Sequence, residues 1–197
     1  MTINIRPEIK VLENIIISTR RDIHQNPELS NREFRTAEKV ANHLRSLGME
    51  VQTGVAHTGV VALLKGGKPG KVVALRADMD GLPVKEKVDL PFASKAKGIY
   101  QGNEVDVMHA CGHDNHVAGL MGAAEILASM KGDLPGTVKF IFQPAEEGFA
   151  GAKAMIDDGL FEKFPASSIY GMHNMPGLEA GHLRVAPGPM MAAADNF

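Results

Sequence analysis

Cysteine is almost absent from this sequence, because Cys111 is the only one among 197 residues. A single cysteine cannot form a disulfide within the chain, and this scarcity is typical of proteins kept in a reducing compartment. We therefore expect a cytoplasmic protein.

Long hydrophobic runs and long basic runs are also missing. The longest apolar stretches, such as residues 59–64, are much shorter than the roughly 20 residues that cross a bilayer. Residues 1–10 carry charges and have no apolar centre of the signal-peptide type. The net charge is -2 at pH 7, and no basic patch is evident that would suit nucleic acid. Neither a membrane nor a nucleic acid is expected as a partner.

What the sequence does contain is a globular composition with alternating helical and strand patterns. Hydrophobic residues make up 44% and charged residues 22%, enough for a substantial core in one or two domains. Helical periodicity or helix-ending signals mark four segments, at 9–26, 34–47, 116–130 and 150–158. Short β-branched runs predict strands at 59–64, 71–76, 137–142 and 167–172, with a further candidate at 181–185.

This alternation predicts an α/β fold, with a mixed, mostly parallel sheet flanked by helices. Residues 30–33, Ser-Asn-Arg-Glu, have the pattern of a capping box before the second helix. Residues 66–70 form a glycine-rich turn between the first two strands, and residues 83–108 resemble a long loop. Residues 186–197 look like a linker that leads to another part of the protein.

The densest group of chemically active residues is His-Ala-Cys-Gly-His-Asp-Asn-His at 109–116. Thiolate and imidazole are both good ligands for zinc and neighbouring transition metals. Cys111 and His113 are two residues apart, so extended backbone would project them to one side. The alternative is a polar loop in which Asp114 or Asn115 caps the following helix.

Three other groups of this kind directly follow predicted strands. Glu146 and Glu147 suit a division of labour in which one carboxylate binds metal and the other takes a proton from water. Asp78 and Asp80 could orient a ligand histidine, and His173 follows the last of these strands. Taken singly, these residues could be solvated glutamates, an Asp-Gly turn and a structural histidine. Together they predict one site at one edge of the sheet.

The same residues resemble a known family, the M20 peptidases and amidohydrolases. The matching segments, in chain order, are 21–30, 76–83, 109–114, 143–148 and 171–176. Their sequences are similar to the branch that contains hippurate hydrolases, N-acyl-amino-acid amidohydrolases and indole-acetyl-amino-acid hydrolases. The resemblance covers nearly the whole chain.

The resemblance implies a role for each matching residue. By this resemblance the metal ligands are Cys111, His113, Glu147 and His173. The general base and acid is Glu146. Asp80 would orient a ligand at the metal site. Asp78 occupies the position at which other M20 branches have a metal-binding histidine, and Cys111 would take over part of that binding.

The resemblance also implies the chemistry and the extent of the protein. Two divalent metal ions, of Mn, Zn, Ni or Co, would catalyse hydrolysis together with the protein. The substrate, and the small-molecule partner of the chain, would be an N-acyl amino acid. Family members are longer, so residues 1–185 are interpreted as the N-terminal part of the catalytic domain. Residues 186–197 would lead to a lid domain, which in relatives carries dimer contacts, and a later segment would supply one more histidine ligand. Such a portion is expected to be weakly active or inactive alone, and a homodimer is possible in the full-length protein.

Other interpretations stay open at this point. The chain could belong to a dipeptidase or carboxypeptidase with the same chemistry, or it could be a non-catalytic binding domain. A structural zinc site is less compatible with the sequence, because such sites are usually closed by four Cys or His ligands. His24, which lies in the 21–30 segment, is expected to have a structural role.

Overall fold

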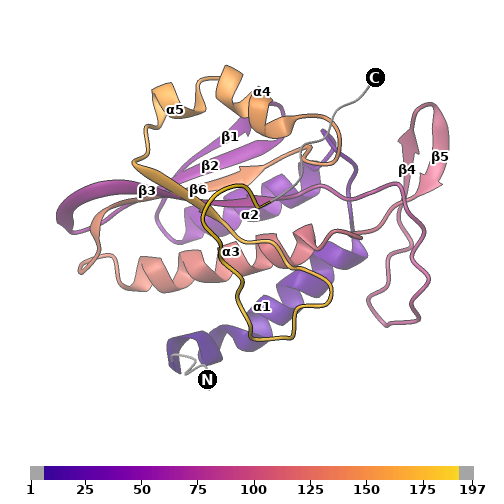
Figure 1. Cartoon of the computed structure of the whole chain (residues 1–197), viewed down its shortest axis with the longest axis horizontal. Helices are drawn as coiled ribbons and strands as arrows, with labels where there is room; N and C mark the ends of the chain where they lie inside the picture. Colours follow the sequence, from indigo (N-terminus) through magenta and orange to yellow (C-terminus); the bar gives the residue numbers. More distant parts are fainter. Residues whose placement is uncertain (1–6, 191–197) are drawn as a thin grey trace.

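The computed structural model describes residues 7–190 as an α/β sandwich with a small separate hairpin (Figure 1). The helices are α1 (Pro7–Gln25), α2 (Phe34–Ser46), α3 (His113–Ser129), α4 (Gly151–Asp157) and α5 (Leu160–Lys163). The strands are β1 (Glu50–Val55), β2 (Gly59–Lys65), β3 (Lys68–Asp78), β4 (Lys97–Tyr100), β5 (Asn103–Asp106), β6 (Pro135–Gln143) and β7 (Ser168–Gly171).

Five of the strands form the main sheet, in the order β1-β2-β6-β3-β7, and β4 pairs only with β5. The pairings β1–β2 and β2–β6 are antiparallel, whereas β6–β3 and β3–β7 are parallel. The sheet is therefore mixed, as the sequence predicted. Its parallel half consists of β6, β3 and β7, whose carboxyl ends lie along one edge.

Helices cover both faces of this sheet. Figure 1 shows α1, α2 and α3 on one side and the short helices α4 and α5 on the other. Phe140 and Phe142 of β6 point into the larger core under α1 to α3, and Ile141, which alternates with them, packs in the smaller core beside α4 and α5. This alternation is the period-two pattern of a strand buried on both faces, and it makes β6 the centre of the fold.

Several local expectations differ from the structure. β2 and β3 follow one another in the chain but do not pair with each other. β6 lies between them and pairs with β2 along one edge and with β3 along the other. Strand β1 and the β4–β5 hairpin were not predicted, since their short sequences are mostly polar and mostly exposed. The strand expected at 181–185 is absent from the described residues, where this segment is exposed and irregular.

The predicted capping box is also wrong. Glu33 occupies the N-cap position of α2, but its side chain makes no capping hydrogen bond. The carboxylate of Glu28 caps the helix instead, accepting from the backbone amides of Arg35 and Thr36 at 2.9 and 2.8 Å. Ser30 donates its hydroxyl to Asp80 at 2.6 Å. The residues between α1 and α2 thus turn toward the sheet edge.

Two expectations about the whole chain are tested only partly. None of the helices among residues 7–190 is long and apolar enough to cross a membrane. Residues 186–190 contain no helix or strand, and residues 191–197 lie outside the described part of the chain. The interpretation of 186–197 as a linker stays a prediction.

A buried lysine on β6 gives a testable pH dependence. Lys139 is fully buried, and its ammonium group donates to the backbone carbonyls of Leu160, at 3.0 Å, and Phe164. Burial lowers its pKa to about 8, below the roughly 10.4 of an unfolded lysine. Unfolding therefore takes up a proton between these pH values, so the free energy of unfolding should rise with pH there, by at most about 1.4 kcal/mol per pH unit.

Denaturant unfolding at pH 7.5 to 10.5 measures this effect. The rise should be smaller in Lys139→Met by the contribution of one lysine. Lys153→Met is the matched control, because it removes an exposed lysine paired with Asp157. This variant should show the same rise of the free energy of unfolding with pH as the wild type. An identical pH dependence in the wild type and Lys139→Met would contradict the assignment.

Candidate metal centre

The candidate site lies where the parallel strands end. Asp78, the last residue of β3, pairs in register with Gln143, the last residue of β6. β7 ends beside them, with Gly171 opposite Arg76. The loops that follow these strands therefore start at nearly the same level, as parallel strands require. They carry Asp80, the Glu146–Glu147 pair and His173, which the sequence had placed at one edge.

The first turn of α3 brings the histidines to the same edge. Gly112 precedes the helix at φ 81°, and a Cβ there would come within 2.1 Å of the Asn174 side chain. Only glycine tolerates both conditions. Gly112 is the N-cap, so the alternative in which Asp114 or Asn115 caps the helix does not hold. His113 and His116 are three residues apart and share one face of the helix, with ring centroids 5.5 Å apart.

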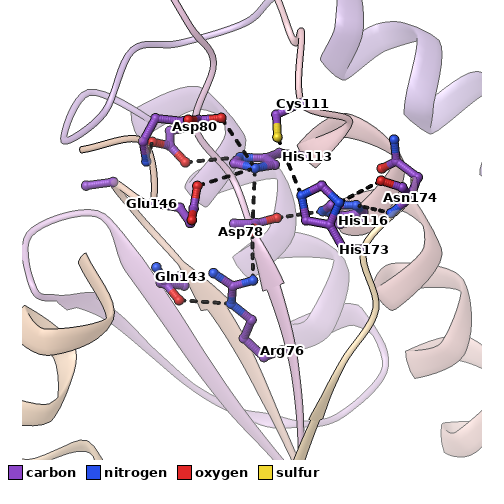
Figure 2. Close-up of polar contacts among 12 residues, drawn as sticks. Arg76, Asp78, Asp80, Cys111, His113, His116, Gln143, Glu146, His173 and Asn174 are labelled. Atoms are coloured by element: carbon purple, nitrogen blue, oxygen red, sulfur yellow. Dashed lines mark hydrogen bonds and ion pairs between the residues drawn. The ribbon is translucent and has the colours of Figure 1, made fainter. Parts of the chain in front are cut away.

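His113 is the centre of the site (Figure 2). Its Nδ1 donates to Asp80 Oδ1 at 3.1 Å, which leaves Nε2 as the nitrogen available to a metal ion. Nε2 lies 3.6 Å from Asp78 Oδ2, 3.8 Å from Glu146 Oε2 and 3.7 Å from Glu147 Oε1. One imidazole nitrogen thus faces carboxylates from the end of β3 and from the loop after β6.

Cys111 and His173 complete the other side of the site. Cys111 Sγ lies 3.5 Å from His173 Nε2, and His173 Nδ1 donates to the carbonyl oxygen of Asn174 at 2.6 Å. The potential ligand atoms of Cys111, His113 and His173 all lie within 4.8 Å of one another, and the same holds for His113, Glu146 and Glu147. The structure therefore brings together all four residues that the sequence proposed as ligands and places Glu146 beside them.

His116 is a residue to which the sequence analysis gave no role. Its Nδ1 donates to Asp78 Oδ1 at 2.7 Å, and its Nε2 accepts from the backbone amide of Asn174 at 3.1 Å. Asp78, His113 and His116 form a third group with ligand atoms within 4.8 Å of one another. The available signal was the spacing of three between His113 and His116 on a helix. With both nitrogens bonded, His116 ties Asp78 to the loop that carries His173.

The acidic residues of the site differ in how well they are compensated. Burial opposes the ionisation of Asp78, but the hydrogen bond from His116 and the charge of Arg76, whose Nη1 is 2.7 Å away, hold its pKa at about 2. Burial likewise opposes the ionisation of Asp80, and hydrogen bonds from His113, Ser30 and the Glu147 amide lower its pKa. Both aspartates are therefore ionised at neutral pH.

Cys111 and Glu147 are less well compensated, although the charge of His113 partly opposes the shift at Glu147. Burial, and then the negative charges of Glu147 and Glu146, raise the pKa of the Cys111 thiol to about 12. Burial also raises the pKa of Glu147, with Glu146 adding to the effect. A divalent cation would reverse both shifts, because it stabilises a thiolate and a carboxylate together.

The unpaired atoms of the site fit a metal ion. His113 Nε2 and Glu147 Oε1 are both buried, and neither has a hydrogen-bond partner among the described residues. Their separation of 3.7 Å is below the roughly 4.2 Å that two ligands on one zinc ion can reach. A nitrogen and a carboxylate oxygen that face each other at this distance are suited to hold a cation between them. Sulfur, nitrogen and oxygen donors together suit Zn, Mn, Ni or Co.

Two further histidines of the sequence analysis lie outside this site. His24 is buried and bonded through Nδ1 to Asp114, at 2.8 Å, and through Nε2 to Glu86, at 3.0 Å. These bonds fit the structural role expected for it. His109 is buried near His24, their ring centroids 6.5 Å apart, and burial lowers its pKa to about 4. It belongs to no group of potential metal ligands found in residues 7–190.

Comparisons with known proteins match the part of the chain that carries this site. The sequence profile of peptidase family M20/M25/M40 matches residues 74–191, the region that contains the site. A crystal structure of a dinuclear metal-binding peptidase of the M20 family from Bacillus subtilis is 43% identical, with a TM-score of 0.76. That match covers 86% of this chain and 45% of the other.

Two curated relatives are similar over almost all of this chain. Thermostable carboxypeptidase 2 of Saccharolobus solfataricus is 46% identical, and the match covers 98% of this chain and 47% of the relative. Hippurate hydrolase of Campylobacter jejuni is 45% identical, with 98% and 48% covered. The chain thus spans about half the length of the curated relatives it matches.

Proposed function

Because the chain belongs to peptidase family M20/M25/M40, we propose that it contributes most of a metal-dependent site that hydrolyses the amide bond of N-acyl amino acids. The observation that carries this proposal is the convergence of Cys111, His113, Glu147 and His173 around buried, unpaired ligand atoms. Residues 1–185 would be the N-terminal part of a catalytic domain, and 186–197 a linker to a lid domain.

Each residue has a role that follows from its contacts. Cys111, His113, Glu147 and His173 would hold two divalent ions, together with a ligand from elsewhere in a longer protein. Asp80 accepts from His113 Nδ1 and from the Glu147 amide, so it orients one ligand and holds the backbone of another. Bound metal would supply Lewis acidity toward the amide carbonyl and lower the pKa of the attacking water.

Glu146 is the proposed general base and acid. Its Oε2 lies 3.8 Å from His113 Nε2, and its side chain is 42% exposed, compared with 20% for Glu147. It can therefore reach a water molecule or a substrate beside the ligands without being enclosed among them. Glu146 would take a proton from the attacking water and deliver it to the nitrogen of the departing amino acid.

A peptidase activity is the second candidate. A relative named as a carboxypeptidase and one named as a hippurate hydrolase are almost equally similar to this chain. Both activities would cut an amide bond to the nitrogen of an amino acid, so the site described here serves either. A non-catalytic binding domain would need none of the acid–base geometry around Glu146, which makes it the weaker alternative.

A substrate panel tests the proposal. The chain is assayed with N-benzoyl and N-acetyl amino acids, unblocked dipeptides and N-blocked dipeptides, with added Mn²⁺ or Zn²⁺, beside a full-length relative. We expect metal-dependent release of the amino acid from the N-acyl substrates, weak at most with this chain alone and strong with the full-length relative, abolished by a chelator and restored by metal. Faster cleavage of dipeptides would favour the peptidase alternative. Failure of the chain to bind any divalent metal would remove the proposed function altogether.

A further inference from the structure

The turn that carries Glu146 and Glu147 is held in an unusual backbone conformation. Ala145, the residue before them, has φ 52°, in the left-handed region that non-glycine residues rarely adopt. Glycine at 151 allows the end of the turn to approach Pro144 closely, and its amide donates to the Ala145 carbonyl at 3.0 Å. Such a conformation persists only where surrounding contacts fix it.

The remaining backbone group of Ala145 is bonded to a side chain from the other end of the chain. The Ala145 amide donates to Glu33 Oε1 at 2.8 Å, across 112 positions of sequence. Glu33 is fully buried, and it also accepts from the Asn31 amide at 3.0 Å and from the Thr58 hydroxyl at 2.6 Å. All of its partners are donors, and they fix the carboxylate in one place.

A second bond fixes the same turn two residues later. The Glu147 amide donates to Asp80 Oδ2 at 2.9 Å, and Ser30 donates to the same oxygen at 2.6 Å. The segment between α1 and α2 therefore contacts both loops of the site, the loop after β6 through Glu33 and the loop after β3 through Ser30. A side chain that binds the backbone beside two functional carboxylates controls where those carboxylates lie.

We propose that Glu33 is a positioning residue of the metal site, which sets the place of Glu146 and Glu147 through its hydrogen bond to the Ala145 amide. The proposal rests on the roles given above to these two glutamates. Without Glu33, the Ala145 amide would be buried without a partner, and the turn would relax away from φ 52°. Removing such an outer partner of a metal site typically costs about 10- to 100-fold in metal affinity or activity.

The chain contains a matched control for this residue. Glu28 lies on the same segment and also accepts from two backbone amides and a threonine hydroxyl, those of Arg35 and Thr36. Its partners belong to the first turn of α2, and among the described residues neither of them bonds to the turn at 144–151. Glu28→Ala should therefore lower stability by loss of a helix cap and leave the turn at 144–151 in place.

Two measurements on the 197-residue chain test the proposal. Hydrogen–deuterium exchange of the 143–151 amides should be faster in Glu33→Ala than in the wild type and unchanged in Glu28→Ala. Titration with Co²⁺ or Zn²⁺ should show an affinity about 10-fold or more lower in Glu33→Ala, with no change in Glu28→Ala. Glu33→Gln should restore both values, because its amide oxygen can accept from Ala145 while its NH2 group donates to Thr58.

The outcomes separate this proposal from the proposed function. If Glu33→Ala does not fold, Glu33→Met fills the same space without accepting a hydrogen bond and takes its place. Equal losses of metal affinity in the Glu33 and Glu28 variants would reduce Glu33 to a stabilising residue and overturn the proposal. If the wild type binds no metal, the proposed function fails, and exchange at 143–151 still decides whether Glu33 holds the turn.

Discussion

Replacing Glu146 by glutamine in a full-length context is expected to lower kcat by about 10²- to 10⁴-fold, the usual contribution of a general acid–base group. The amide has nearly the same shape but cannot take a proton from water. Metal content should stay unchanged, because Glu146 is the more exposed of the two glutamates and the buried, unpaired oxygen belongs to Glu147. The measurement pairs steady-state kinetics on the best panel substrate with elemental analysis of the purified protein.

Glu147→Gln is the matched control for that experiment. It changes the neighbouring side chain in the same way, but we expect the opposite effects on metal content and on catalysis. Glu147→Gln should lose metal, and its activity should return when excess metal is added. If Glu146→Gln loses the metal and Glu147→Gln keeps it, the two roles are reversed. Undiminished hydrolysis in Glu146→Gln would remove Glu146 from the mechanism.

Replacing His113 by alanine should have the largest effect on metal binding. His113 is the only residue common to all three groups of potential ligands found among residues 7–190. Its Nε2 is buried, without a hydrogen-bond partner in this part of the chain. The loss of affinity for Zn²⁺ or Mn²⁺ should therefore exceed the about 10- to 100-fold typical of an outer partner. Isothermal titration calorimetry measures it directly.

Two variants make this result specific. Cys111→Ala removes a ligand that belongs to one group only, so it should lower metal content less than His113→Ala. His24→Ala removes another buried, carboxylate-bonded histidine that belongs to none of these groups. It should lower the unfolding midpoint without a comparable loss of affinity. Metal affinity that is retained in His113→Ala would contradict the site as described.

The edge of the sheet at which the site lies could be predicted from the sequence. Asp80, Glu146 and His173 each come shortly after a β-branched run, and the carboxyl ends of parallel strands necessarily meet. The helical spacing after His113 was equally visible. These signals are local, because each depends on residues within one turn of helix or a few positions of strand.

The partners of those side chains could not be predicted in the same way. Residues 30–33 have the local pattern of a capping box, yet Glu33 bonds to Ala145 and Ser30 to Asp80. His116 appeared as one of three clustered histidines, and only the position of β3 shows that it bonds to Asp78. A capping preference is worth about 1 kcal/mol, and a buried carboxylate left without donors costs more than that.

The sequence by itself determined which residue types stand at the ends of strands and at the start of α3, and through them the family and the class of chemistry. The tertiary structure decided which atoms meet. It placed β6 between β2 and β3, directed His113 Nε2 toward Glu147, and brought Glu33 to a backbone amide 112 residues away. The physical reason is that periodicity and propensity act over a few residues, whereas the hydrogen bonds of buried polar groups are satisfied by whichever segments the packed core brings together.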